Sequence, residues 1–165
     1  MTDVNLEDIF PALEAQATRL NEASAFANKT LAETEKRVVA LNIGFEIWLD
    51  EPIFVGEPVG GVGPFETSTT PLKALGLARI DGKWVFAVKP MKYVDGFYDG
   101  DTGSPFRNQF VDGDAIPVLS ASRAMRIAAL QALPKFLDKL RQEVASTTIG
   151  IENIVGRLSP EKPSQ

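Results

Sequence analysis

The chain has 165 residues, no histidine, no cysteine and a formal net charge of −5. This length suits one domain, and a content of 44% hydrophobic and 24% charged residues argues against wholesale disorder. The missing residue types exclude a Ser-His-Asp triad, a zinc site with histidine or cysteine ligands, and disulfide bonds. We therefore lean against an enzyme and expect no cofactor.

Targeting and partner signals are equally sparse. No apolar run approaches the ~20 residues that span a bilayer, and the N-terminus lacks a basic flank before an apolar segment. An acidic chain without a basic tail is a poor partner for nucleic acid or an anionic membrane. We expect a soluble, cytoplasmic protein.

Residues 8–42 are predicted to form one long helix. Asp8 suits the N-cap and Pro11 the first turn. The helix stops near Asn42 and Gly44; a rival interpretation ends it near Arg37 and begins a strand at Val38. Small and apolar residues recur at alternating steps of three and four, as in a heptad seam. They are Leu13, Ala17, Leu20, Ser24, Ala27, Leu31, Thr34, Val38 and Leu41.

The length of this helix suggests self-association. Thirty-five residues span ~50 Å at ~1.5 Å per residue, whereas a compact domain of this size is ~40 Å across. Such a helix overhangs its own domain or pairs with another long helix. The alternative is that its seam packs on the sheet and the C-terminal helices of the same chain.

The middle of the chain is predicted to hold a small antiparallel sheet of three or four strands. Residues 45–49 alternate as a strand, and residues 51–73 form a loop rich in proline and glycine. Asp81-Gly82 between two alternating runs is typical of a two-residue hairpin turn. This hairpin places Leu75, Leu77, Trp84, Phe86 and Val88 on one face.

Residues 91–114 form an acidic, aromatic loop. Counted from Asp99, an EF-hand pattern fails, because Gly103 takes position 5 and Phe110 position 12. A looser cation site from Asp99, Asp101, Asp112 and Asp114 is a weak candidate, and a series of Asp-Gly turns is the preferred interpretation.

The aromatic residues of this loop need an explanation. Exposed together, they would form an apolar patch that monomers rarely tolerate. They therefore cover the core, meet a second subunit or line a recognition surface. The segment contains Tyr93, Phe97, Tyr98, Phe106 and Phe110.

The C-terminal region is predicted to form a pair of helices, with a disordered tail over 159–165. Pro134 interrupts the pattern, either as the first residue of a new helix or as a kink. An apolar seam continues across both helices. Its members are Leu130, Leu133, Leu137, Leu140, Val144, Thr148, Ile151, Val155 and Leu158. Arg123 and Arg126 lie on one helix face and, with Arg79, are anion-binding candidates; the preferred alternative is ion pairing with Glu46, Asp112 or Asp114.

These patterns predict a single α+β domain over residues 1–158. The preferred function is a non-enzymatic, homo-oligomeric interaction module, most simply a homodimer. The interface candidates are Leu13, Leu20, Ala27, Leu31, Phe97, Tyr98, Phe106 and Phe110. In size, acidity and α+β build the chain resembles the chaperones of bacterial secretion systems, which implies an alternative role as a chaperone or adaptor for a protein client. A metal-dependent enzyme using the Asp95–Asp114 carboxylates is the third hypothesis.

Overall fold

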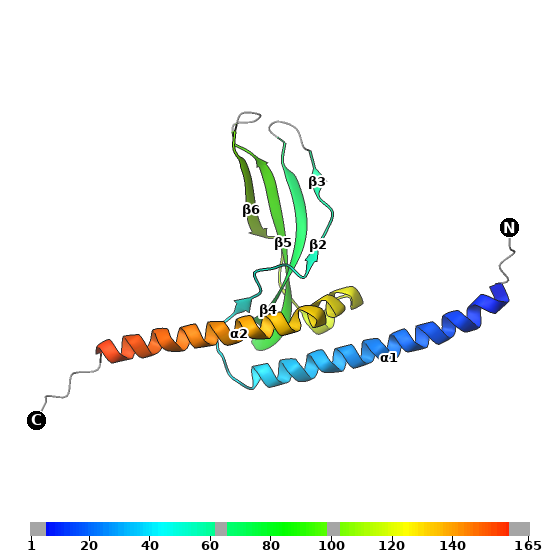
Figure 1. Ribbon diagram of the computed structural model, residues 1–165, viewed down its shortest axis with the longest axis horizontal. Helices are drawn as coiled ribbons and strands as arrows, with labels where there is room; N and C mark the ends of the chain where they lie inside the picture. The colour runs from blue at the N-terminus through cyan, green and yellow to red at the C-terminus, as the bar shows by residue number, and fades with distance from the viewer. Residues whose placement is uncertain (1–5, 62–65, 99–102, 159–165) are drawn as a thin grey trace, which may run out of the picture.

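The computed structural model describes residues 6–61, 66–98 and 103–158, and it is an α+β structure (Figure 1). Two long helices lie on one side of a curled antiparallel sheet, which stands away from them. The elements are α1 (Leu6–Val39), β1 (Ile47–Trp48), β2 (Phe54–Val55), β3 (Val59–Gly60), β4 (Ser68–Ile80), β5 (Lys83–Phe97), β6 (Pro105–Val111), β7 (Ile116–Pro117), the 3-10 turn η2 (Val118–Ser120) and α2 (Arg123–Leu158).

Both helices are single elements. Helix α1 begins at Leu6, two residues before the expected cap, and ends at Val39, between the two expected ends. Asn42 and Gly44 follow with positive φ values of 51° and 79°, which carry the chain out of the helix. The expected pair of C-terminal helices is wrong: α2 runs through Pro134 without a break. Proline removes one backbone hydrogen bond, and the packing of α2 on the sheet supports the remaining turns.

The sheet has seven strands in the described part of the chain, more than the three or four expected. Strands β4 and β5 are its spine, paired from Ser68 opposite Asp95 to Ile80 opposite Lys83. Asp81 and Gly82 join them with positive φ values of 49° and 79°. Strands β1, β2 and β3 pair with β4, while β6 and β7 pair with β5. Four of the seven strands have two residues each, too few for alternation to reveal.

The segment 51–73, expected to be a loop, contains β2, β3 and the first six residues of β4. Strand β4 therefore begins at Ser68 and includes Pro71, whose carbonyl accepts a hydrogen bond from the Gly56 amide at 2.8 Å. Pairing with β5 orders residues 68–73 as a strand. This pairing joins residues far apart in the chain, so the composition of the segment does not predict it.

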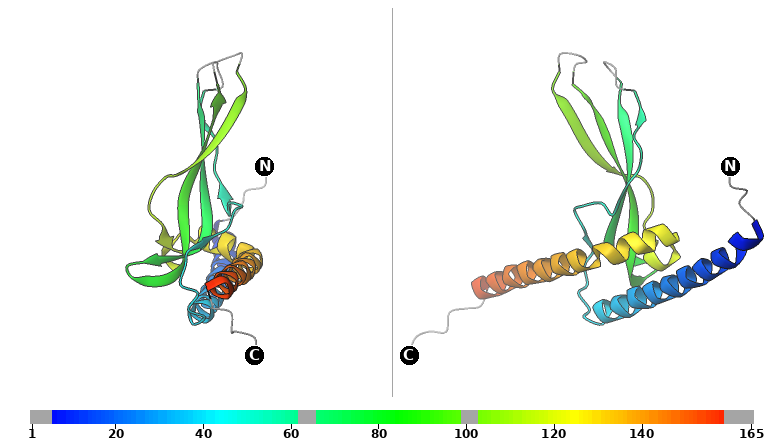
Figure 2. Two further views of the ribbon diagram at one scale, coloured as in Figure 1. Left: turned by 90° about the vertical axis from the view of Figure 1, so that its left-hand side faces the viewer. Right: turned by 45° about the vertical axis from the view of Figure 1, so that its right-hand side comes forward.

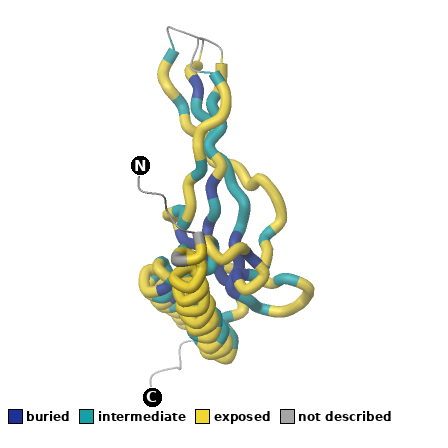
Figure 3. Tube along the Cα trace, turned by 90° about the vertical axis from the view of Figure 1, so that its right-hand side faces the viewer, coloured by how far each residue is buried: buried dark blue, intermediate teal, exposed yellow. Residues whose placement is uncertain are grey.

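The core lies where the base of the hairpin meets the helices. Leu75, Leu77, Phe86 and Val88 are at most 2% exposed, and the Phe86 and Phe136 rings pack edge to face at 5.6 Å. Figure 3 shows that the buried segments gather mainly at this junction, whereas the helix ends are exposed. The other ends of β4, β5 and β6 form a projecting arm (Figure 2).

The opposite face of the hairpin is covered by Trp48, which the register pairs with Gly76. The Lys89 ammonium lies 3.7 Å from the centre of the indole ring. The small residues of this face, such as Gly76 and Ala78, leave room for a closely packed neighbour. A single indole takes that place, because β1 adds to the edge of β4 and carries Trp48 over the glycine.

The two helices run in the same direction but are staggered. In Figures 1 and 2 both run along one axis; the N-terminal half of α1 extends past one end of α2, and the C-terminal half of α2 extends past the other end of α1. At one end of their overlap Arg123 donates to Asn21 at 3.1 Å, and at the other Val38 and Leu140 line one groove. Among the described residues, neither helix contains a stretch that is both long and apolar enough to cross a membrane.

Candidate functional site

The overhanging helix ends carry exposed apolar side chains. We call residues 6–20 of α1 the head segment and residues 144–158 of α2 the tail segment. Leu13 and Leu20 of the head segment are 57% and 49% exposed, and Ile151 and Leu158 of the tail segment are 57% and 77% exposed. Ile9, Phe10, Ile154 and Val155 are exposed as well. Exposed apolar side chains grouped on one helix end indicate an interaction surface.

In the head segment, the exposed leucines lie on the face that is buried further along α1. Leu13 precedes Leu31 by 18 residues, which is five turns at about 3.6 residues per turn. Leu20 precedes Val38 by the same interval. Leu31 and Val38 are 1% and 5% exposed and belong to the core. The head segment therefore continues the packing face of α1 beyond the end of the domain.

The tail segment has the same relation to the rest of α2. Ile151 follows Leu133, and Leu158 follows Leu140, again by 18 residues or five turns at about 3.6 residues per turn. Leu133 and Leu140 are 6% and 4% exposed in the core. Both helices thus present, at their free ends, the face that they use for packing in their covered halves.

An open groove of ≈ 680 Å³ begins where α1 ends beside α2. Apolar side chains form most of its wall, and it leads from the core to the tail segment. The lining residues are Val38, Leu41, Asn42, Ile43, Phe45, Leu137, Leu140, Arg141, Val144, Thr147, Thr148 and Ile151. The groove is therefore the continuation of the α1–α2 packing into a region that α1 does not fill.

The interface candidates on α1 separate into two groups. Leu13 and Leu20 are exposed, as an interface requires, and Ala27 is half-buried. The prediction that Leu31 belongs to the interface is wrong, because Leu31 is 1% exposed within the core of its own chain and cannot contact a partner. The sheet and α2 cover α1 only over its second half, so the same seam is core at one end and surface at the other.

The aromatic candidates lie on the projecting arm. Phe97, Tyr98 and Phe110 are about half exposed, at 47%, 57% and 47%. The Tyr98 and Phe106 rings are 4.9 Å apart, and the Phe106 ring lies over Gly96, where an added Cβ would come within 2.7 Å of it. Tyr98 and Phe106 therefore cover each other on the arm, while Phe97 and Phe110 remain partly accessible.

Two of the described carboxylates in residues 91–114, Asp95 and Asp112, form ion pairs. Asp95 accepts two hydrogen bonds from Arg107, at 2.6 and 3.1 Å, and Asp112 accepts one from Lys92 at 2.7 Å. The hydrogen bond from Arg107 lowers the pKa of Asp95. Within the described residues no three acidic groups gather as a metal site. The weak metal candidates Asp99 and Asp101 lie outside those residues.

The three arginines that were candidates for anion binding make separate hydrogen bonds. The Arg79 Nε donates to the Gly82 carbonyl at 3.2 Å, and the Arg126 guanidinium donates to the Ala121 carbonyl at 2.5 Å. Arg123 donates to Asn21. Asp112 forms its ion pair with Lys92. The expected ion pair between Asp112 and Arg123 or Arg126 is therefore not formed. Anion binding by the arginines stays a prediction.

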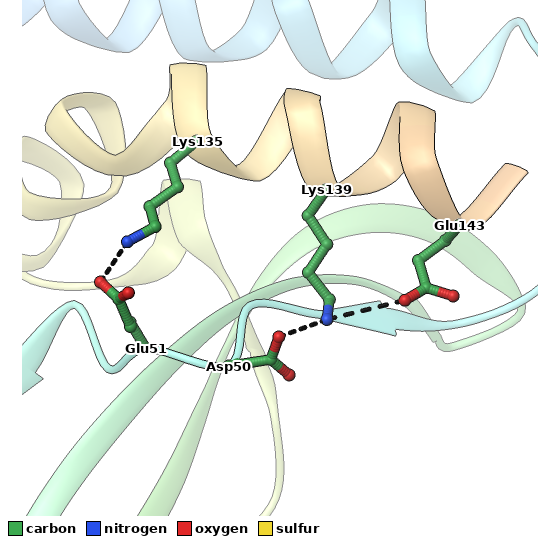
Figure 4. A network of polar contacts seen from close by, with 5 residues as sticks. All are labelled: Asp50, Glu51, Lys135, Lys139 and Glu143. Carbon is green, nitrogen blue, oxygen red and sulfur yellow. Dashed lines mark hydrogen bonds and ion pairs between the residues drawn. The ribbon is translucent and has the colours of Figure 1, made fainter. Parts of the chain in front are cut away.

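A network of charged side chains ties the segment after β1 to α2 (Figure 4). Lys139 donates to Asp50 at 2.5 Å and lies 3.7 Å from Glu143, and Lys135 pairs with Glu51. The hydrogen bond that Lys139 donates to Asp50 raises the pKa of Lys139. Sequence reasoning missed this network, since its partners are far apart in the chain, and the only local signal is lysine spacing at i, i+4 on α2.

Glu35 is a second residue that the sequence did not single out. Its carboxylate accepts a hydrogen bond from the Phe86 amide of β5 at 2.6 Å. Burial raises the pKa of Glu35, and the Phe86 hydrogen bond opposes that shift. The signal in the sequence is a charged residue on the packing side of the α1 seam. Its role is to bond a strand amide in the core, so it joins α1 to the sheet.

Comparison of the chain with protein-family models, with curated proteins and with solved structures finds no match in any of the three.

Proposed function

We propose that the chain is a non-enzymatic, homo-oligomeric protein-interaction module that assembles through its helix ends. The observation that supports this function is the exposure of the α1 and α2 packing faces on the head and tail segments. Leu13 and Ile151 are each 57% exposed, although they lie on faces that form the core in the covered half of each helix. Covering these faces removes apolar surface from water, which favours association.

The size of the gain predicts reversible assembly. Eight side chains contribute: Ile9, Phe10, Leu13, Leu20, Ile151, Ile154, Val155 and Leu158. Burying the exposed half of each gives roughly 6–12 kcal/mol in total, from about 1.5–3 kcal/mol per fully buried side chain. Association itself costs roughly 4–15 kcal/mol. The two quantities are similar, so we expect an oligomer that grows with concentration.

Light scattering coupled to size-exclusion chromatography tests this function. We expect the mass per particle to exceed that of one chain at micromolar concentration and to rise further on concentration. Leu13→Glu should lower it, because the substitution places a charge on the head segment, while glutamate keeps helix propensity. A monomer across the whole concentration range contradicts the proposed function.

The arm supports a second candidate, an adaptor for a protein client. Strand β6 is at the edge of the sheet, and its Phe110 and Val111 side chains are 47% and 61% exposed. An extended client segment can add to such an edge as a further strand. Extended peptides presented to the full chain should then shift the backbone amide NMR signals of β6, and shifts confined to the helices would contradict this mode.

The metal-dependent enzyme that uses the Asp95–Asp114 carboxylates stays the third hypothesis, and two of its candidates, Asp99 and Asp101, lie outside the described residues. The described carboxylates Asp95 and Asp112 are engaged with Arg107 and Lys92. Calorimetric titration with Ca²⁺, Mg²⁺ and Mn²⁺ tests it, and the absence of binding would remove it.

A further inference from the structure

The two exposed helix segments point in opposite directions along one axis. Because α1 and α2 run the same way and are staggered, the head segment leaves the domain at one end and the tail segment at the other (Figure 1). Each segment is 15 residues, or about 22 Å of helix at ~1.5 Å per residue. A second copy displaced along the axis would bring its head segment beside the tail segment of the first copy.

We propose that copies of this chain assemble head to tail, with the head segment of one copy lying parallel to the tail segment of the next. This inference rests on the proposed function and adds its geometry. The contact joins two different surfaces, the head segment of one copy and the tail segment of another, so it is heterologous. The first argument for it is the packing between α1 and α2 within one chain, which the new contact would continue.

The packing within the chain has a defined register. Asn21 contacts Arg123, and Val38 and Leu140 line the same groove; in both cases the numbers differ by 102. This offset places Leu31 level with Leu133 and Val38 level with Leu140. At this offset, two core residues seven positions apart on α1 lie level with two core residues seven positions apart on α2.

The same register can be repeated between copies. Leu13 and Leu20 are seven residues apart, as are Ile151 and Leu158, and each pair lies five turns from its buried counterpart at about 3.6 residues per turn. Placing Leu13 level with Ile151 puts Leu20 level with Leu158. The head segment then occupies the line that α1 of the first copy leaves at Val39, and it continues the apolar groove.

This placement fits the length of the helices. Within one chain, Val39 at the end of α1 lies level with position 141 of α2. In the assembly, Leu6 at the start of the next copy's α1 would lie level with Val144 of α2, three residues further on. The shift between copies is 36 residues, or about 54 Å at ~1.5 Å per residue. Successive α1 helices therefore follow one another along the α2 seam with a small gap.

A symmetric dimer that pairs like segments accounts less well for the exposed surfaces. Pairing two head segments would leave both tail segments exposed, and pairing two tail segments would leave both head segments exposed. A single head-to-tail contact covers one of each, and its repetition covers every segment except those at the two ends. The exposure of both segments in one chain is therefore explained by one kind of contact.

Complementation between two blocked variants tests the proposal. Leu13→Glu with Leu20→Glu blocks the head segment, and Ile151→Glu with Leu158→Glu blocks the tail segment. We expect each variant to be monomeric alone and an equimolar mixture to form particles of twice the monomer mass. Circular dichroism and thermal unfolding of each monomer establish that it is folded.

Matched controls use exposed apolar residues outside the seam. Ile149 is 58% exposed but points away from the face of Ile151, and Phe26 is 72% exposed on the back of α1. Ile149→Glu and Phe26→Glu should assemble like the unmodified chain. If either control stops assembly as completely as the blocked variants do, the contact does not follow the seam and the proposal is overturned.

The remaining outcomes separate the geometry from the function. A wild-type monomer overturns the proposed function itself. If the wild type is an oligomer and the head-blocked or tail-blocked variant still dimerises alone, the function stands. The head-to-tail contact is then overturned in favour of a contact between like segments. A mixture of blocked variants that stays monomeric while the wild type assembles also overturns it.

Cross-linking gives an independent readout of the register. The chain has no cysteine, so each introduced thiol is unique. One preparation carries Leu20→Cys, with its tail segment blocked by Ile151→Glu. The other carries Leu158→Cys, with its head segment blocked by Leu13→Glu. Mixed together, the two should form a disulfide between the thiols introduced at positions 20 and 158. A mixed pair of Phe26→Cys and Leu158→Cys is the control, and equal yields for both pairs contradict the register.

Discussion

At the residue scale, Gly76 is the position where the sheet depends most directly on a missing side chain. A Cβ there would lie 2.3 Å from Trp48 Cε3 and 2.6 Å from the Ile47 carbonyl oxygen. The carbonyl belongs to the paired strand β1, so it cannot move away without breaking that pairing. Gly76 thus allows the indole to lie flat on β4.

We expect Gly76→Ala to destabilise the fold by about 1–3 kcal/mol, the usual cost of overpacking. Urea unfolding followed by Trp fluorescence measures the change. Gly150→Ala is the matched control: nothing lies within 4 Å of its added Cβ, so the substitution should stabilise α2 by about 0.5–1 kcal/mol. Loss of stability only in the control would contradict the packing of Trp48.

Glu35 gives the fold a pH dependence. Burial raises its pKa above the ordinary value of 4.5, so ionisation of this carboxyl opposes folding. Its contribution to the free energy of unfolding is therefore fully present below pH 4.5 and is lost as the pH rises through the higher pKa of the folded state. Glu35→Gln, which keeps an oxygen acceptor for the Phe86 amide, should remove this loss.

Urea unfolding of both proteins between pH 4 and 8 measures the difference. We expect the wild type to lose stability relative to Glu35→Gln as the pH rises. Glu33→Gln is the control, because the Glu33 side chain is 67% exposed, with Lys29 3.9 Å away. A difference that grows in the opposite direction, with the wild type gaining on Glu35→Gln, would contradict the role of burial.

At the element scale, α1 presents one face in two environments. Leu31 and Leu13 are the same residue type on the same face, yet they are 1% and 57% exposed. Leu31→Ala should lower the free energy of unfolding by about 2–5 kcal/mol, since it leaves a cavity in the core. Leu13→Ala should change it by less than about 0.5 kcal/mol at concentrations where the chain is monomeric. Equal losses would contradict the staggered arrangement of the helices.

At the scale of the whole molecule, the stagger of the helices decides what kind of assembly can form. A heterologous contact closes into a ring if the rotation between copies permits it, and otherwise extends as a filament. The arm stands to one side of the helix axis, so repeated copies would display their arms along the outside (Figure 2). In the proposed assembly the helices would join the copies, and the β6 edge would face away from that contact.

The sequence by itself determined the local elements and their faces. The three-four spacing from Leu13 to Val38 and from Leu130 to Leu158 identified both apolar faces, because helical period is a local property. The same pattern indicated an interface on α1, and Leu13 and Leu20 are exposed there. It could not indicate four strands of two residues each, which form only because β4 and β5 are already in place.

Only the tertiary structure decided which half of each seam is core and which is surface. Leu13 and Leu31, or Ile151 and Leu133, are equivalent in phase, and nothing local distinguishes them. Their burial depends on where the sheet lies along the helices, which is set by contacts between residues far apart in the chain, such as Glu35 with Phe86 and Asp50 with Lys139. Periodicity specifies the direction of a side chain around its helix, whereas its burial depends on what packs at that height.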